Sequence, residues 1–169
     1  MPVSKAQPTD VQQLNILVNS AYRGETSKQG WTTEADLLDG MRIDEETLDG
    51  YFNDPAVTIL KSTDNNGQIN GCVYLEERGT QLYIGMFSVS PALQGKGIGR
   101  DLLLAAEDYA RTAGIHTLTM TVISVRRELL DWYERRGYQP TGEIKPFHVH
   151  EKFGIAKQHI ELLVLEKTI

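Results

Sequence analysis

The sequence is organised around the stretch Gln94-Gly95-Lys96-Gly97-Ile98-Gly99-Arg100. An apolar run, Leu82 to Val89, precedes this stretch, and apolar residues at helical spacing follow it from Ile98 to Ala113. A strand that ends in a glycine-rich turn and opens into a helix predicts an anion site, because several backbone N–H groups then point at one spot. Lys96 and Arg100 add positive charge at the same place. The stretch therefore predicts a ligand that contains phosphate.

The spacing of the glycines narrows the choice of ligand. Dinucleotide-binding turns follow the pattern G-x-G-x-x-G, whereas these glycines are Gly95, Gly97 and Gly99, without the acidic residue expected about 20 residues later. A nucleotide-triphosphate loop places Ser or Thr after its lysine, whereas Lys96 precedes a glycine. Taken alone, the stretch is also compatible with a turn that only connects a strand to a helix.

The length, composition and net charge limit the class of protein to which this chain can belong. The 169 residues suit a single domain, 1–169, with 40% hydrophobic and 24% charged residues. The net charge of −6 argues against nucleic acid as a partner, and no run approaches the roughly 20 apolar residues that cross a membrane. The sequence starts without the apolar segment of a signal peptide, and its one cysteine, Cys72, lies in an apolar run. We therefore expect a cytoplasmic protein with Cys72 in the core.

The acidic residues are concentrated near the N-terminus. Nine of them lie between Glu25 and Asp54, where only Lys28 and Arg42 oppose them, so this segment carries a net charge of −7. Solvated helix faces would explain the composition. The functional interpretation is a rim that attracts a cationic substrate. Trp31 lies in the same segment, in a predicted loop, where it packs against the protein or against a substrate.

The hydrophobic pattern predicts an α+β fold. We expect helices after the Thr9-Asp10 and Thr32-Thr33 caps, over 44–52, over 98–113 and over 126–136, with an irregular segment over 145–158. The expected strands cover residues 3–6, 56–61, 69–76, 81–89, 117–123, 138–143 and 160–165. Strand 81–89, the glycine turn, the next helix and strand 117–123 predict a right-handed parallel βαβ unit.

Two motifs together resemble the GNAT superfamily of N-acetyltransferases. Val89 to Gly99 is similar to the family signature (Arg/Gln)-x-x-Gly-x-(Gly/Ala). About 40 residues later, Leu130 to Tyr138 resembles the family's helix end (Leu/Phe)-Tyr-x-x-x-Gly-(Phe/Tyr). The expected order of elements matches the family along most of the chain. The resemblance implies a central mixed sheet of about six to seven strands flanked by about four helices.

The resemblance also implies an activity and a set of site residues. It implies transfer of an acetyl group from acetyl-CoA to a primary amine, with Tyr133 as the general acid for the departing thiolate. An aromatic residue in the core is the structural alternative for Tyr133. Phe87 and Val89 would offer backbone groups to the pantetheine arm, which lies between the diverging strands. The residues expected to bind acetyl-CoA are Phe87, Val89, Gln94, Gly95, Lys96, Gly97, Ile98, Gly99, Arg100 and Arg126.

The sequence departs from the family pattern at two positions. Tyr83 stands where the histone-modifying branch has a catalytic glutamate, so no carboxylate base is expected at that position. Two alternatives for the base stay open. One is Glu34, Glu76 or Glu77 acting through ordered water, and the other is solvent alone. Arg126 stands where many members have asparagine, and we expect it to meet a CoA phosphate. The residues expected on the acceptor side are Trp31, Glu34 and Tyr83. His148, His150 and His159 lack a supporting set of ligands, so no metal site is expected.

The acceptor is the least determined part of the prediction. The acidic segment and Trp31 favour a small cationic amine as the substrate, and a protein or peptide amine is the alternative. A non-catalytic acyl-CoA sensor is the rival from another class, and a different acyl-CoA donor is a further alternative. Dimers are common in the family that the chain resembles, and a homodimer through the terminal strand is one arrangement open to it.

Overall fold

The structure, a computed structural model, describes residues 2–23, 27–28, 30, 33–35, 37–147 and 155–169. Its main sheet has seven strands in the order β1-β3-β4-β5-β6-β9-β7. These strands are β1 (Val3–Lys5), β3 (Val57–Thr63), β4 (Ile69–Arg78), β5 (Gln81–Val89), β6 (Thr117–Ile123), β7 (Gln139–Pro146) and β9 (Glu161–Thr168). Two further strands, β2 (Leu38–Asp39) and β8 (Ile155–Ala156), pair with each other.

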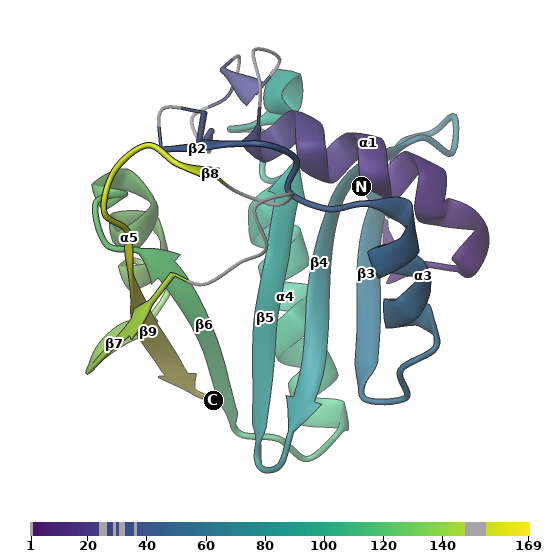
Figure 1. Cartoon of the computed structure of the whole chain (residues 1–169). Coiled ribbons are helices and arrows are strands. Elements are labelled where there is room, and N and C mark those ends of the chain that lie inside the picture. Colours follow the sequence, from purple (N-terminus) through teal and green to yellow (C-terminus); the bar gives the residue numbers. More distant parts are fainter. Residues whose placement is uncertain (1, 24–26, 29, 31–32, 36, 148–154) are drawn as a thin grey trace.

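The described α-helices flank this sheet (Figure 1). They are α1 (Val11–Tyr22), α3 (Glu45–Phe52), α4 (Ile98–Thr112) and α5 (Arg127–Glu134). Neighbouring strands of the sheet run antiparallel except β5 and β6, which are parallel and joined through α4. The mixed sheet, the helices and this βαβ unit confirm the predicted fold class. Among the described helices, none has the length and hydropathy of a membrane span.

The helices divide the core between the two faces of the sheet (Figure 1). α1 and α3 pack on one face, where Leu14, Leu48 and the expected core cysteine, Cys72, are fully buried. α4 packs on the other face and buries Leu102 and Ala106. Each helix shows an apolar stripe at the spacing that a one-sided contact requires. The site residues at the start of α4 are therefore held by a helix that is anchored along its length.

The contact between α4 and β4 depends on a glycine. A Cβ atom at Gly71 would lie 2.9 Å from Ile98 Cγ2 and 2.9 Å from Leu102 Cδ1. The same Cβ atom would lie 3.3 Å from the backbone carbonyl oxygen of Ser88. Because the start of α4 carries the glycine turn, this close approach fixes the turn against the end of β5.

An extra residue interrupts the pairing of β5 with β4. Cys72 pairs with Ser88 and Tyr74 pairs with Gly85, so β5 has one residue more than β4 between these two pairs. Met86 lies in this bulge with a φ of 48°. A φ in the left-handed region is unusual for a non-glycine residue and is typical of a functional or strained position.

The bulge changes which face of the sheet the β5 side chains occupy. Before it, Leu82 and Ile84 belong to the core on the α4 side. Met86 belongs to the core on the α1 side. After it, Phe87 and Val89 lie on the α4 side. One extra residue thus turns Phe87 and Val89 toward the helix that follows them.

The parallel pairing of β5 and β6 is short. It joins Gln81–Tyr83 to Thr117–Thr119 and extends no further. On its other edge β6 pairs with β9 along its whole length, from Thr117 to Ile123. β5 and β6 therefore diverge toward the glycine turn, as the ribbon shows (Figure 1).

One predicted helix is wrong. The cap at Thr32-Thr33 was expected to start a helix that contains Leu37 and Leu38, but Leu38 lies in β2. This strand pairs with Ile155–Ala156, inside the segment expected to be irregular. A partner more than a hundred residues away overrides the local pattern, which carries no information about it.

Substitution of Gly71 tests the packing of α4 on the sheet. We expect Gly71→Ala to lower the free energy of unfolding by about 1–3 kcal/mol, because the new Cβ overpacks the contact with Ile98 and Leu102. Gly50→Ala is the matched control, since Gly50 lies inside α3 with no atom within 4 Å of its Cβ position. That change should raise the stability by roughly 0.5–1 kcal/mol. Urea unfolding of the two variants measures both, and equal effects would contradict the close packing.

Candidate active site

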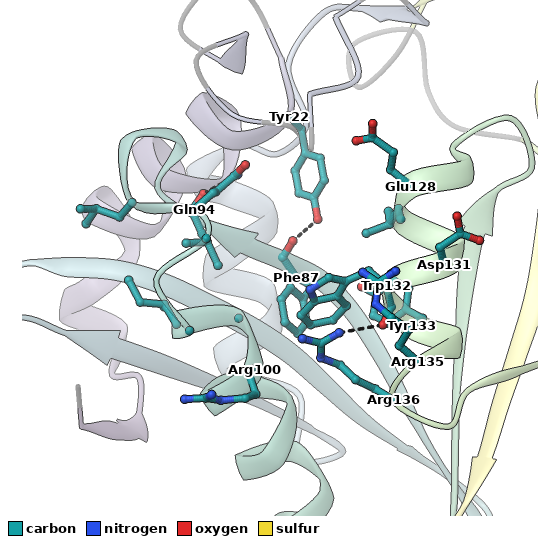
Figure 2. Close-up of a pocket in the computed structure, with 17 residues that line it drawn as sticks. Tyr22, Phe87, Gln94, Arg100, Glu128, Asp131, Trp132, Tyr133, Arg135 and Arg136 are labelled. Carbon is teal, nitrogen blue, oxygen red and sulfur yellow. Dashed lines mark hydrogen bonds between the residues drawn. The ribbon is translucent and has the colours of Figure 1, made fainter.

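A cavity of about 590 Å³ lies between the start of α4 and α5, and we call it the α4–α5 cavity. Figure 2 shows its walls, with the glycine turn on one side and α5 on the other. Among the residues expected to bind acetyl-CoA, those that line it are Phe87, Val89, Gln94, Gly95, Gly97, Ile98, Gly99 and Arg100. Lys96 belongs to the same turn, where it is exposed and is not a lining residue.

The glycine turn has the backbone shape that its sequence predicts. Gly95 and Gly97 have φ values of 85° and 86°, a conformation that side chains with a Cβ rarely adopt. Gly97 is the N-cap of α4. The Gln94 side chain braces the turn, since its Nε2 donates to the carbonyl of Val89 at 3.1 Å. The first N–H groups of α4 have no partner within their own helix, and they open toward the cavity.

Positive side chains gather at this cavity. Arg100, Arg135 and Arg136 all line it. Arg136 stacks over the ring of Trp132, with its guanidinium carbon 3.7 Å from the ring centroid, and donates to the Trp132 carbonyl at 2.9 Å (Figure 2). Burial lowers the pKa of Arg136, and the charges of Arg135 and Arg100 lower it further. Like charges held this close favour a polyanion between them.

The donor atoms therefore fit the phosphates of CoA. The turn supplies backbone N–H groups, the helix supplies its positive end, and the arginines supply mobile charge. Glu128 and Asp131 also line the cavity, on the α5 side. Sequence reasoning missed Arg135 and Arg136, although both lie inside the second motif as a pair of adjacent cations.

Tyr133 is a buried residue that lines the α4–α5 cavity. Its residue is only 5% exposed, and its ring contacts three aromatic neighbours edge to face: Phe87 at 6.3 Å, Trp132 at 5.2 Å and Tyr138 at 6.0 Å between centroids. Burial raises the pKa of Tyr133 well above its usual value, and the nearby Tyr22 raises it further. The hydroxyl is therefore protonated at neutral pH and is a hydrogen-bond donor.

A second tyrosine, which sequence reasoning missed, completes this region. Tyr22 is the last residue of α1, and its hydroxyl donates to the backbone carbonyl of Phe87 (Figure 2). Burial raises the pKa of Tyr22 to about 12, and the charge of Glu34 adds to the effect. The contact joins residues 65 positions apart. Nothing in the helical pattern of α1 indicates that its last residue reaches β5.

A cavity of about 310 Å³ opens where β5 and β6 diverge, and we call it the β5–β6 cavity. It shares four lining residues with the α4–α5 cavity: Tyr22, Phe87, Leu129 and Tyr133. A ligand in one cavity can therefore meet a ligand in the other beside Tyr133. This arrangement suits a reaction between two substrates that enter from different sides.

Charged residues of both signs line the β5–β6 cavity. Glu34 accepts from Arg23 Nε at 3.1 Å and lies 3.4 Å from Arg126 Nη1. Arg42 is the remaining charged residue among the described lining residues. Arg126 was expected beside a CoA phosphate, but it lines this cavity and not the α4–α5 cavity. Arg100, Arg135 and Arg136, in contrast, line the α4–α5 cavity and not this one.

The other residues expected on the acceptor side differ in their placement. Tyr83 lines the β5–β6 cavity, with its hydroxyl 3.4 Å from Thr121 Oγ1. Glu76 and Glu77, two of the three candidate bases, are not lining residues. Arg78 and the hydroxyl of Tyr74 both donate to Glu76 and lower the pKa of its carboxyl. Trp31, His148 and His150 lie outside the described residues, and His159 is exposed and contacts Glu161 at 3.1 Å.

Buried tyrosines give the site a measurable response to alkaline pH. Burial is the main cause that raises the pKa of five of the seven tyrosines: Tyr22, Tyr51, Tyr74, Tyr133 and Tyr138. We expect these five to remain protonated in the folded protein near pH 10, where free tyrosine ionises. Because the folded state favours the protonated phenols, the contribution of these tyrosines to the stability should be constant below about pH 10 and should fall above it.

The ultraviolet absorbance of tyrosinate measures this directly. All seven side chains should ionise near pH 10 in denaturant, whereas the five buried tyrosines should ionise at higher pH in the folded chain. Coincident titration curves for the folded and the denatured protein would show that the tyrosines around the two cavities are not buried.

Comparison with known proteins gives one family. Residues 26–151 match the family model described as the acetyltransferase (GNAT) domain. Mycothiol acetyltransferase from Rhodococcus erythropolis is 29% identical over 141 residues, which cover 78% of this chain and 44% of that protein. The enzyme of the same name from Pseudarthrobacter chlorophenolicus is 29% identical over 73% of this chain and 38% of its own length. The chain thus spans less than half the length of these relatives.

Solved structures show the same fold. The ribosomal-protein-S18-alanine N-acetyltransferase from Escherichia coli has a TM-score of 0.75 at 16% identity and covers 99% of this chain and 93% of its own. Ribosomal-protein-alanine N-acetyltransferase from Brucella melitensis has a TM-score of 0.73 at 21% identity, and each chain is covered in full. A protein from Salmonella typhimurium, solved with its cofactor acetyl-CoA, has a TM-score of 0.73 at 19% identity and covers 99% of this chain and 93% of its own.

Proposed function

The chain belongs to the GNAT acetyltransferase family, and from this premise we propose that it transfers the acetyl group of acetyl-CoA to a primary amine of a small molecule. The observation that carries the proposal is the position of Tyr133, which lines both the α4–α5 cavity and the β5–β6 cavity. The donor would occupy the first cavity and the acceptor the second.

The α4–α5 cavity would bind acetyl-CoA, which supplies the activated acetyl thioester. The N–H groups of the turn over residues 95–100 would hold the pyrophosphate, with charge from Arg100, Arg135 and Arg136. Phe87 and Val89 lie beside the space between β5 and β6, where their backbone groups would orient the pantetheine arm. Positioning of this kind accounts for a large share of the rate, because it removes the entropy of bringing the reactants together.

Chemistry would follow by direct attack. The amine nitrogen attacks the thioester carbonyl carbon, the C–S bond breaks with its electron pair moving to sulfur, and the nitrogen releases a proton to solvent. Tyr133 would donate a hydrogen bond to the developing thiolate and then its proton, with solvent returning a proton to the phenol. The raised pKa of Tyr133 keeps the donor proton in place at neutral pH. A backbone N–H of β5 near Phe87 or Val89 would stabilise the carbonyl oxygen.

The amine must lose a proton before it attacks. Of the three carboxylates considered as the base, only Glu34 lines the β5–β6 cavity, and it is bound to Arg23 and Arg126. Both of its carboxylate oxygens are engaged, Oε1 by Arg23 and Oε2 by Arg126, so it is poorly placed to accept the proton of an amine. We therefore propose that the proton leaves through water to solvent, without a dedicated carboxylate base.

The acceptor is a small molecule in this proposal because of the size of the β5–β6 cavity and because of the relatives. About 310 Å³ is at the lower end of the range for small-ligand sites. The relatives are named mycothiol acetyltransferases, after a small molecule. Two of the structural neighbours are named for ribosomal-protein alanine, so a peptide N-terminus is the second candidate, and an acetylation screen with both kinds of amine separates them.

Substitution of Tyr133 tests the catalytic proposal. We expect Tyr133→Phe to lower kcat about a hundredfold or more, because the thiolate loses its proton donor, while the dissociation constant of CoA changes little. Tyr109→Phe is the matched control, since the Tyr109 hydroxyl contacts Thr58 on the other side of α4 and lines neither cavity. A wild-type kcat in Tyr133→Phe would show that Tyr133 is not the general acid. CoA binding without turnover in the wild type would favour the sensor.

Substitution of Arg136 tests the donor cavity. We expect Arg136→Gln to weaken CoA binding about tenfold and to reduce its dependence on salt, because one charge-assisted contact to phosphate is lost. Arg111→Gln is the control, since Arg111 lies exposed near the end of α4 beside Asp108. Titration calorimetry at two salt concentrations measures both variants. Equal losses in the two would show that the effect comes from net charge and not from this cavity.

A further inference from the structure

We propose that Tyr22 is a positioning residue for the acetyl donor, because it holds the bulge of β5 so that the Phe87 N–H points at the thioester oxygen. The inference rests on the proposed function, since it concerns how that reaction would activate acetyl-CoA. Tyr22 comes from α1, outside both sequence motifs, and it lines both cavities. Its hydroxyl donates to the backbone carbonyl of Phe87 (Figure 2).

The backbone groups of Phe87 face the space between β5 and β6. The N–H of Ser90 donates to the carbonyl of Asn70, on the β4 side, at 2.9 Å. Backbone groups alternate between the two edges of a strand, so those of Phe87, three residues before Ser90, point away from β4. The ladder between β5 and β6 ends at Tyr83. Phe87 therefore presents its N–H and its carbonyl where the two strands have separated.

A second set of contacts orients the peptide between Met86 and Phe87. The Met86 carbonyl accepts from Ser88 Oγ at 3.1 Å and from Cys72 Sγ at 3.8 Å, and both of these side chains are buried. The C=O and the N–H of a trans peptide point in opposite directions. The Phe87 N–H therefore points away from Cys72 and from β4, the same direction as the Phe87 carbonyl.

The bulge needs contacts of this kind to keep its shape. Met86 has a φ of 48°, and such a conformation persists only where the surroundings determine it strongly. Tyr22 holds one carbonyl of the bulge, and Ser88 with Cys72 holds the one before it. The Phe87 ring also packs edge to face on Tyr133, at 6.3 Å between centroids. A shift of Phe87 would thus disturb the proposed general acid as well.

The direction of these groups matters because of the charge that the reaction creates. The thioester oxygen becomes negative as the amine attacks, and a backbone N–H aimed at it stabilises that charge. The carbonyl of Phe87 faces the same space, where its own partial negative charge would oppose the effect. The Tyr22 hydroxyl offsets that charge by donating to the carbonyl. Burial raises the pKa of Tyr22 to about 12, so the hydroxyl keeps its proton at neutral pH.

Infrared spectroscopy of bound acetyl-CoA tests the inference without knowledge of the acceptor. The probe is acetyl-CoA labelled with ¹³C at the thioester carbonyl, whose stretching frequency falls as the hydrogen bond to its oxygen strengthens. Tyr22→Phe removes the hydroxyl and keeps the ring in the walls of both cavities, and we expect its carbonyl band at higher frequency than that of the wild type. Tyr109→Phe is the matched control with the wild-type band, since its hydroxyl contacts Thr58 and it lines neither cavity.

Steady-state kinetics with the best amine of the acetylation screen gives a second readout. We expect Tyr22→Phe to lower kcat about tenfold, since a hydrogen bond to a developing charge is misaligned. The KM for acetyl-CoA and the dissociation constant of CoA should keep their wild-type values. Ser88→Ala is a second variant, which releases the Met86 carbonyl, and its band should move in the same direction. A hydrogen bond of Tyr22 that is only structural would lower the melting temperature and change neither kcat nor the band.

The outcomes separate the inference from the proposed function. A wild-type band in folded Tyr22→Phe overturns the role of Tyr22 while acetyl transfer stands. If Tyr22→Phe does not fold, Ser88→Ala decides, and a wild-type band in that variant overturns the inference. Shifted bands without turnover of any amine support the inference and overturn the proposed transfer. Failure of the wild type to bind acetyl-CoA overturns both.

Discussion

The site depends on a short pairing between two parallel strands. β5 and β6 are hydrogen-bonded through Gln81–Tyr83 and Thr117–Thr119, and they then separate. Continued pairing would fill this part of the sheet with backbone hydrogen bonds and leave no passage between its two faces. Separation leaves backbone groups of β5 available, and it places the β5–β6 cavity beside the α4–α5 cavity. The helices on the two faces of the sheet are each anchored by their own part of the core.

The bulge at Met86 determines which β5 side chains lie beside this opening. A regular strand would direct Phe87 and Val89 to the α1 face, away from the glycine turn. The extra residue directs both to the α4 face, where they line the same cavity as the turn. The hydroxyl of Tyr22, at the end of α1, donates a hydrogen bond to the backbone carbonyl of Phe87. A left-handed conformation at Met86 is the local cost of this change, and the pairing on both sides of the bulge holds it in place.

Local patterns predicted most of the fold. The strand over Thr117–Ile123 and the helix over Asp44 to Phe52 follow from alternation and from capping, and the structure places both within a residue of the prediction. The helix expected after Thr32-Thr33 failed because β2 is defined by its pairing with β8. Patterns of this kind record what a segment prefers alone, and they do not record which distant segment it meets.

The candidate site could be predicted only where its residues belong to contiguous motifs, because local patterns do not record contacts between distant segments. The glycine turn and Tyr133 belong to contiguous motifs, so the sequence displays them. Tyr22 and Arg42 come from segments whose composition indicates only helix or surface, and they reach the cavities through the packing of α1 on the sheet. The composition of residues 25–54 does not say which of its charged side chains point inward. Glu34 and the arginines point inward, whereas the acids of α3 do not.

A crystal structure of the protein with acetyl-CoA tests the central claim most directly, namely that the gap between β5 and β6 holds the thioester between the two cavities. The account predicts the pyrophosphate against the backbone N–H groups of residues 95–100. It also predicts the thioester sulfur within hydrogen-bonding reach, roughly 3.5 Å, of the Tyr133 hydroxyl. Acetyl-CoA bound with its phosphates away from the turn, or with its sulfur outside the gap, would contradict it.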